Sequence, residues 1–101
     1  MADGQPTSTS PILSNAQVRV KNCRHGPMAY NIGDTYVGRS LDLYGEYVEA
    51  ETAILDQLLK PGMVALDIGA NMGAHTVYMA KKVGLEGAVA AFEPQRHIFQ
   101  L

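Results

Sequence analysis

The chain has 101 residues, 47% of them hydrophobic and 18% charged, which fits at most one ordinary globular domain. Eight basic against ten acidic residues give a net charge of −2 without any basic cluster, so we expect no nucleic-acid partner. A single cysteine, Cys23, excludes an internal disulfide and favours a reducing, cytoplasmic location. No segment has the pattern of a signal peptide, and no apolar run approaches the roughly 18 residues of a membrane span.

The first half of the chain divides into two segments by composition. Residues 1–16 are rich in Ser, Thr, Pro, Gly and Ala, and this low apolar content predicts a flexible leader. Residues 17–45 read as β-rich, because apolar and polar residues alternate over 18–21 and again over 28–32. Turn residues at 25–27 separate the two runs, so we expect an antiparallel hairpin or small meander there.

A helix is predicted over residues 47–60, because apolar residues recur at helical spacing and Pro61 then stops it. One face collects five apolar residues: Val48, Ile54, Leu55, Leu58 and Leu59. The other side carries charges: Glu49, Asp56 and Lys60. Glu51 falls within the apolar face, where a carboxylate is unusual. Either it reaches the rim or pairs with a base such as Arg39, or it faces the cationic end of a ligand.

Residues 46–101 read as the start of an α/β domain with a Rossmann-like sheet. A buried strand over 63–68, a helix over 74–83 and a second buried strand over 88–92 make one parallel βαβ unit. Pro94 is expected to open the next helix. The chain stops soon afterwards, so we expect a truncated domain with only its first two parallel strands and helices, poorly stable or aggregation-prone when expressed alone.

The turn after the first parallel strand carries the chemistry. Asp67 lies near the strand end, and Gly69, Ala70, Asn71 and Gly73 follow with little side-chain bulk. A glycine-rich turn lets a ligand approach the backbone. The spacing is not the G-x-G-x-x-G of dinucleotide-binding turns. Asp67 brings negative charge to the strand end, which suits a ligand with an amine or a sulfonium and suits a pyrophosphate poorly.

A second acid, Glu93, ends the next parallel strand and should lie near the same turn. A carboxylate there can accept hydrogen bonds from ribose hydroxyls. It can also cap the helix that follows Pro94, and both roles are compatible. Asp67, the turn and Glu93 together predict a pocket for a ribose-bearing cation.

At these residues the chain resembles S-adenosylmethionine-dependent methyltransferases, and most closely the FkbM-type O-methyltransferases. The resemblance rests on LDIGANMGAHTVYMAKKVG followed by AAFEP, with DTYVGRSLDLYGEYVEAE and LKPG upstream, and it covers about residues 34–101. It implies a seven-stranded Rossmann-like sheet with S-adenosylmethionine as cofactor, and methyl transfer to a hydroxyl of a small-molecule or sugar-type acceptor. The resemblance implies that the cofactor-binding residues are Asp67, Gly69, Ala70, Asn71, Gly73 and Glu93. Glu51 is a further candidate for cofactor binding, only because it falls on the apolar face of its helix. No residue is assigned as catalytic base.

Other readings of the same residues remain open. A non-catalytic module could bind a nucleotide or cofactor through the same turn, and an NAD-dependent dehydrogenase fragment is disfavoured by the Asp67 spacing. The truncated chain alone is expected to be inactive. His75 in the first helical turn is more consistent with a solvated or acceptor-side residue than a catalytic one. Tyr44 and Tyr47 are expected in the core, or else in the pocket wall. The histidines and Cys23 lack metal-ligand spacing, so no metal is expected.

Overall fold

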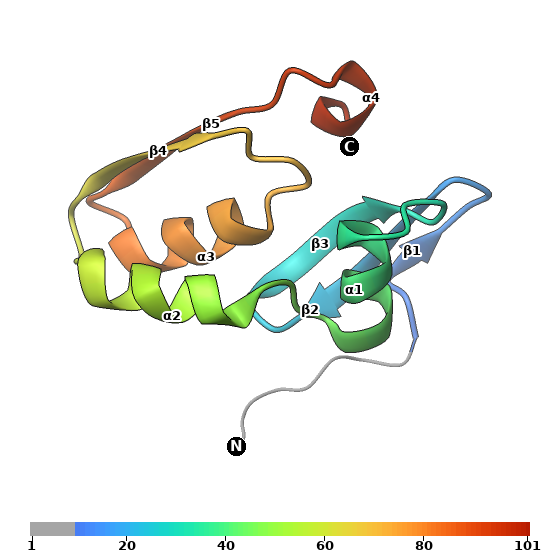
Figure 1. Ribbon diagram of the computed structural model, residues 1–101, viewed down its shortest axis with the longest axis horizontal. Coiled ribbons are helices and arrows are strands. Elements are labelled where there is room, and N and C mark those ends of the chain that lie inside the picture. The colour runs from blue at the N-terminus through green and yellow to red at the C-terminus, as the bar shows by residue number, and fades with distance from the viewer. Residues whose placement is uncertain (1–9) are drawn as a thin grey trace.

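The computed structural model describes residues 10–101, and its first part is a three-stranded antiparallel sheet (Figure 1). The strands follow in chain order: β1 (Leu13–Ser14), β2 (Val18–Cys23) and β3 (Gly26–Asn31). β1 lies inside the stretch expected to be a flexible leader, where the N–H of Ile12 donates to the carbonyl of Val20 (2.7 Å). The antiparallel sheet therefore begins before residue 17. Residues 1–9 of the expected leader lie outside the described residues.

A helix, α1 (Val37–Tyr44), follows the hairpin where the sequence reading expected only β structure. Val37 and Leu41, one turn apart, cover the hairpin and share a core with two of its side chains. These are the buried members of that core: Met28, Tyr30, Val37 and Leu41. The carboxylate of Asp34 accepts the N–H of Gly38 (2.5 Å), which satisfies a donor in the first turn. Gly45, at a φ of 71°, ends the helix.

The next helix, α2 (Glu49–Leu58), is rotated from the predicted packing face: the edge of the apolar stripe with Leu55 and Leu59 is half-buried, and the prediction is wrong for the other edge. Its buried residue is Thr52, only 5% exposed. Ile54 and Leu58 of the stripe are instead 59% and 63% exposed. Glu51, which lies beside them on the wheel, is exposed as well.

Polar contacts explain this orientation of α2. Asp56 accepts hydrogen bonds from the hydroxyl of Tyr78 (2.5 Å) and the ammonium of Lys82 (2.9 Å), both in the third helix. Glu49 lies 3.0 Å from Nε2 of His25 in the hairpin turn. Because each carboxylate finds a partner, the charged side of α2 faces the rest of the chain.

The second half of the chain contains a parallel strand pair, so the protein is mixed α/β. Four elements complete it: β4 (Val64–Ile68), α3 (Ala74–Val83), β5 (Ala88–Phe92) and α4 (Arg96–Phe99). β4 pairs with β5 in an unbroken parallel register, from Val64 opposite Ala88 to Ile68 opposite Phe92. Pro94 does not open the last helix as predicted. Gln95 is the N-cap residue, so Pro94 precedes α4 in extended chain.

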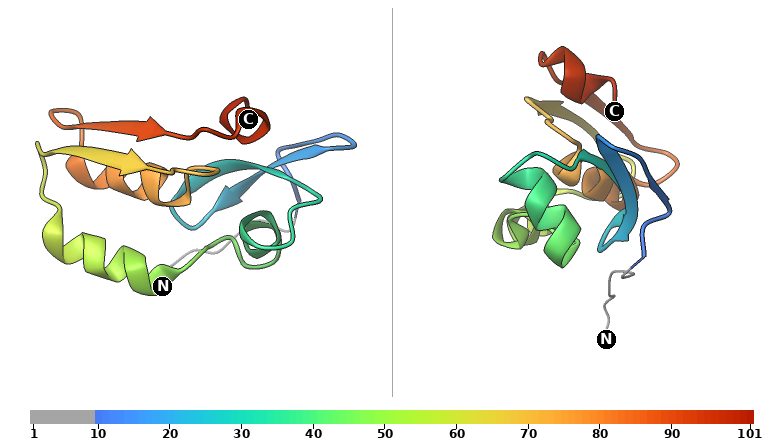
Figure 2. Two further views of the ribbon diagram at one scale, coloured as in Figure 1. Left: turned by 45° about the horizontal axis from the view of Figure 1, so that its top comes forward. Right: turned by 90° about the vertical axis from the view of Figure 1, so that its right-hand side faces the viewer.

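Helix α3 connects the two halves of the molecule. It lies between the parallel strands on one side and α2 on the other (Figure 2). Met79 and Val83 are its buried residues. At its N-terminal end, Ala74 and Val77 pack against the hairpin core. The start of α3 is therefore fixed against the antiparallel sheet, and this position sets the loop that precedes it.

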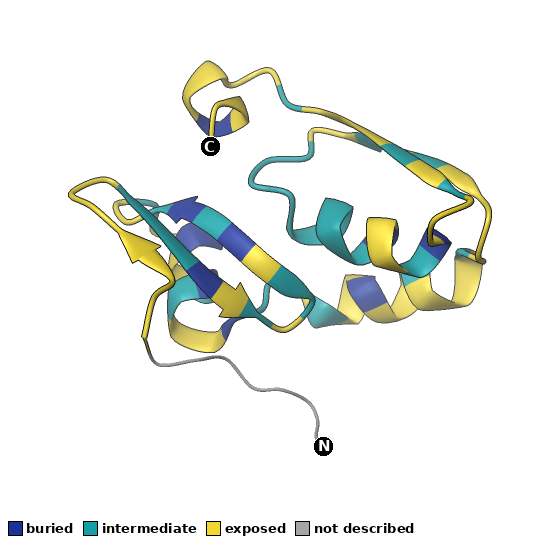
Figure 3. Cartoon of the chain, turned by 180° about the vertical axis from the view of Figure 1, so that it is seen from behind, coloured by how far each residue is buried: buried dark blue, intermediate teal, exposed yellow. Residues whose placement is uncertain are grey.

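The outer face of the parallel pair is uncovered (Figure 3). Val64, Leu66 and Ile68 alternate along β4 and are 75%, 64% and 73% exposed. Their neighbours Ala65 and Asp67 point to the side that α3 covers and are half-buried. Within residues 10–101, no helix is both long and apolar enough to cross a membrane.

Candidate cofactor-binding site

A short loop, Gly69–Gly73, joins β4 to α3 through three left-handed residues. The φ values are 77° at Gly69, 56° at Asn71 and 89° at Gly73. Asparagine tolerates this conformation better than most residues, and its side-chain oxygen accepts the N–H of Met72 (2.8 Å). A Cβ placed on Gly69 would meet no atom within 4 Å. Gly69 is therefore required by its φ, and open space adjoins its backbone.

The backbone N–H groups of this loop all donate within the chain. Those of Gly69 and Ala70 share the carbonyl of Phe92 (2.8 and 2.9 Å). The N–H of Asn71 donates to Oε1 of Glu93 (2.7 Å). The remaining two donate to acceptors within the loop itself, the Asn71 side chain and the Ala70 carbonyl. The N–H groups of residues 69–73 are therefore not free to bind a phosphate, whereas the first turn of α3 has no side-chain cap.

Asp67, at the end of β4, lies against the start of α3. Its Oδ2 accepts a hydrogen bond from the hydroxyl of Thr76 (2.5 Å). It also lines a cavity of about 270 Å³, here called the Asp67 cavity. The wall of this cavity is formed by eight residues: Val37, Tyr47, Asp67, Gly69, Ala70, Asn71, Ala74 and His75. Four of the predicted cofactor residues thus converge on one space.

Glu93 lines a separate cavity of about 260 Å³, here called the Glu93 cavity, together with Gly73. Ala70 and Asn71 line both cavities, so the loop lies between the two acids and adjoins both. Oε2 of Glu93 accepts the N–H of Gln95 (2.9 Å), a contact at the start of α4. Each carboxylate oxygen can accept a further hydrogen bond, so neither contact prevents Glu93 from binding a hydroxyl.

Glu51 stands at the rim of the Asp67 cavity rather than in its wall. Its side chain is 62% exposed, and Oε1 lies 3.5 Å from Nε2 of His75. His75 does line the cavity. Its Nε2 is shielded from solvent and has no hydrogen-bond partner among the described residues. Glu51 is thus exposed and paired with a base, as one of the two alternatives had it, and the base is His75 instead of Arg39.

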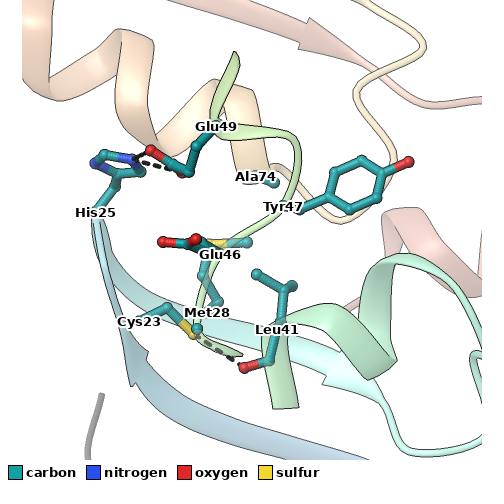
Figure 4. A pocket seen from close by; sticks show the side chains of 9 residues that line it. Cys23, His25, Met28, Leu41, Glu46, Tyr47, Glu49 and Ala74 are labelled. Atoms are coloured by element: carbon teal, nitrogen blue, oxygen red, sulfur yellow. Dashed lines mark hydrogen bonds and ion pairs between the residues drawn. The ribbon is translucent and has the colours of Figure 1, made fainter. Parts of the chain in front are cut away.

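A further cavity between the hairpin and α2 is too small for a substrate (Figure 4). Its volume of about 10 Å³ is at the lower limit for one water molecule. Burial raises the pKa of the Cys23 thiol, so this residue is not an activated nucleophile. The ring of Tyr47 points away from the His25–Glu49 pair. Between residues 10 and 101, no three His, Cys, Asp or Glu side chains converge in a way that could hold a metal ion.

Two residues that take part in this site, Val37 and Thr76, were not among the predicted site residues, whereas Tyr47 was expected there as an alternative to the core. Val37 belongs to α1, which was not predicted, and it reaches the Asp67 cavity only through the packing of that helix. Tyr47 was assigned to the core by default, with the pocket wall as the alternative, and it lines this cavity. Thr76 contacts Asp67 directly. Its place in the first turn of α3, on the arc that faces the sheet, was a usable signal for that contact.

Comparison with known proteins gives one short similarity. Over 36 residues, or 36% of this chain, the sequence is 47% identical to "Ribosomal RNA large subunit methyltransferase E" of Wigglesworthia glossinidia brevipalpis. The match spans only 18% of the length of that relative. No protein-family model and no solved structure matches the chain. The similarity supports a methyltransferase as the class of protein, and it does not extend to the FkbM family.

Proposed function

We propose that this chain is part of an S-adenosylmethionine-dependent methyltransferase with a Rossmann-like fold, which transfers a methyl group to a hydroxyl of a small-molecule or sugar-type acceptor. The observation that carries the proposal is the charge pattern at the loop after β4. Two carboxylates, Asp67 and Glu93, adjoin the loop, while every loop N–H is already paired. The two carboxylates favour a cation over a phosphate, because they attract positive charge and repel negative charge. The short similarity to a methyltransferase agrees with this charge pattern.

The residues present fit S-adenosylmethionine. Its sulfonium and amine would lie near Asp67, and its ribose hydroxyls would donate to Glu93. The open space beside Gly69 lets a ligand contact the backbone. Ala70 and Asn71 line both cavities, so a ligand that lies across them would reach both acids. When bound, the cofactor supplies an electrophilic methyl group.

The contribution of this chain to such a reaction is positioning. An acceptor oxygen must lie in line with the methyl group and the departing sulfur, and correct placement alone can lower a barrier by several kcal/mol, up to roughly 7–11. Thr76 holds the Asp67 carboxylate, and Asn71 with Gln95 holds the Glu93 carboxylate. These contacts limit the freedom of both acids before a ligand binds, which reduces the entropy lost on binding.

Two other functions are distinguished by specific observations. An NAD-dependent dehydrogenase would place a pyrophosphate against this loop, where the loop N–H groups are already paired and Asp67 adds negative charge. A non-catalytic cofactor-binding module would use the same residues as an enzyme. Binding without turnover by the full-length protein, tested over a broad panel of hydroxylated acceptors, would favour that module.

Equilibrium dialysis with labelled S-adenosylmethionine and NAD tests the proposal. We expect S-adenosylmethionine to bind more tightly, and Asp67→Asn and Glu93→Gln each to weaken it roughly tenfold, because each loses a charge-assisted contact. Glu86→Gln is the matched control, since Glu86 is exposed, makes no contact with either cavity and loses the same charge. Tighter binding of NAD, or equal binding by all three variants, would refute the proposal. Glu51→Gln with unchanged affinity would remove Glu51 from the site.

A further inference from the structure

The outer side of α1 is largely exposed and carries an unusual set of side chains. At 100° per residue, Tyr36, Arg39, Ser40, Leu43 and Tyr44 fall on one side of the helix. Tyr36 is 79% exposed and Tyr44 is 68% exposed. Large aromatic side chains left in water are informative when they gather in one place. Here they gather at a groove.

This groove, here called the α1 groove, has a volume of about 440 Å³, within the range of small-molecule sites, roughly 300–1,000 Å³. Its other wall comes from the turn between α1 and α2, through Tyr47 and Val48. Tyr47 also lines the Asp67 cavity, so the groove adjoins the place proposed for the cofactor. A molecule in the groove would therefore share the Tyr47 wall with a ligand in the Asp67 cavity.

Charge and hydrogen-bonding groups in the α1 groove indicate the chemistry of its occupant. Arg39 is the charged residue of the lining, and it forms no hydrogen bond or ion pair with any residue in the described part of the chain. An exposed, unpaired guanidinium in a groove that two tyrosines also line can bind a carboxylate or a phosphate with two parallel hydrogen bonds. Tyrosine rings pack against the C–H faces of sugar rings, and their hydroxyls bind sugar hydroxyls.

The backbone at the groove wall supports a binding role. Val48 adopts φ 53° and ψ 58°, a left-handed conformation that is strained for a β-branched residue. Such strain gathers at ligand sites more often than elsewhere, because the surrounding structure maintains it there for a function. Both Val48 and its neighbour Tyr47 line the groove.

We propose that the α1 groove binds the methyl acceptor, and that this acceptor is an anionic sugar whose ring packs on Tyr36 and Tyr44 while Arg39 binds its carboxylate or phosphate. The inference rests on the proposed function and specifies its acceptor. The carboxylate and phosphate forms share one chemistry, and the experiment separates them. The groove is lined by a single arginine, and the chain carries a net charge of −2, so the groove suits one anionic group rather than a polyanion.

The test is a titration of the ¹⁵N-labelled chain, at a concentration where light scattering shows a monomer, with glucuronate, glucose 6-phosphate and neutral glucose. We expect at least one of the anionic sugars to shift amide signals of residues 35–48, and glucose to bind roughly tenfold more weakly. Arg39→Gln should weaken the anionic sugar by a similar factor, about 1.4 kcal/mol. Tyr44→Ala should also weaken it, and neither change removes a buried side chain. Arg96→Gln is the matched control, since Arg96 is exposed and lies outside the groove.

The outcomes separate this inference from the proposed function. Equal binding of glucose and both anions, no effect of Arg39→Gln, or shifts confined to other residues would overturn the acceptor assignment. Glucuronate alone or glucose 6-phosphate alone in the groove identifies which anion is accepted. A parallel titration with S-adenosylmethionine is read at residues 67–76. If S-adenosylmethionine binds there and none of the sugars binds in the groove, the acceptor assignment is refuted and the methyltransferase proposal stands. If the sugars bind in the groove and S-adenosylmethionine does not bind at residues 67–76, the groove is a sugar site and the methyltransferase proposal fails.

Discussion

Replacing Asp42 with Ala should destabilise the chain by about 2 kcal/mol, because it leaves a buried hydroxyl without a partner. Tyr30 is fully buried, at 0% exposure, and its hydroxyl donates to Oδ1 of Asp42 (2.6 Å). The guanidinium of Arg19 donates to the same oxygen (2.8 Å). Lys21 donates to the backbone carbonyl of Asp42 (2.8 Å), and that contact survives the substitution.

The magnitude follows from which group loses its partner. A buried donor left unsatisfied costs about 1–3 kcal/mol, whereas the half-exposed pair between Arg19 and Asp42 adds little. Tyr30→Phe removes the donor itself and leaves Asp42 with Arg19 and water, so it should cost about 1 kcal/mol. In the Tyr30→Phe background, Asp42→Ala no longer leaves a hydroxyl unpaired. The two changes should therefore couple by about 1 kcal/mol.

Urea unfolding followed by far-ultraviolet circular dichroism at low protein concentration measures the four chains of this cycle. Thermal unfolding gives a second reading, since about 1 kcal/mol corresponds to a shift of roughly 4–8 °C for a domain of this size. If Asp42→Ala costs the same with and without the Tyr30 hydroxyl, the reasoning about the unpaired donor is refuted.

Three further predictions concern pH, backbone strain and the open sheet face. The hydroxyl of Tyr30 and the guanidinium of Arg19 hold the pKa of Asp42 below its usual 3.8. The ionised Asp42 therefore stabilises the fold above pH 3.8, and this stabilisation is lost as pH falls through the lower folded-state pKa. In acid unfolding, the difference in free energy of unfolding between the chain and Asp42→Asn should close over that range, and a constant difference would contradict this. Val48→Gly should stabilise the chain by about 1 kcal/mol, because relief of the left-handed strain exceeds the entropic cost of glycine. In the same urea assay, Ala53→Gly in the interior of α2 should destabilise it by a similar amount. A loss of stability in both variants would count against strain at Val48. The chain should associate as its concentration rises, because the face of β4 is open and apolar. In sedimentation velocity, Leu66→Lys on that face should reduce the associated fraction, whereas Leu85→Lys, in an exposed turn, should leave it unchanged. Equal effects of the two variants would show that the added charge alone is responsible.

The elements that sequence predicted well are those whose signals are local. β4, α3 and β5 follow from an apolar run, a glycine-rich turn and a helical period, each complete within a few residues. Helix α1 was missed because Val37 and Leu41 identify it only once the hairpin core they cover is known. The orientation of α2 was wrong for a related reason. Its apolar stripe is the stronger local pattern, but the partners of Glu49 and Asp56 come from distant segments.

In the candidate site, too, the sequence predicts what depends on local signals and misses what depends on packing between distant segments. The topology of a parallel βαβ unit is enough to bring Asp67 and Glu93 to one loop, and both contact that loop or the helix start beside it. The two acids nevertheless line neighbouring cavities, both of which Ala70 and Asn71 line, and no period or spacing predicts this division. The contributions of Val37 and Tyr47 depend on how the N-terminal half packs on α3, so they required the structure.

This packing also makes the two proposed binding sites depend on one helix. The inner side of α1 carries Asp42 and Val37, and its outer side carries Arg39. Val37 lines the Asp67 cavity, so a shift of α1 would disturb that cavity and the α1 groove together. Asp42→Ala, which loosens the inner side, should therefore weaken S-adenosylmethionine and the anionic sugar alike in the dialysis and amide titrations. Arg39→Gln should weaken the sugar only. If Asp42→Ala left the cofactor affinity unchanged while the sugar was lost, the cavity would not depend on the position of α1, and the proposed link between the two sites would be wrong.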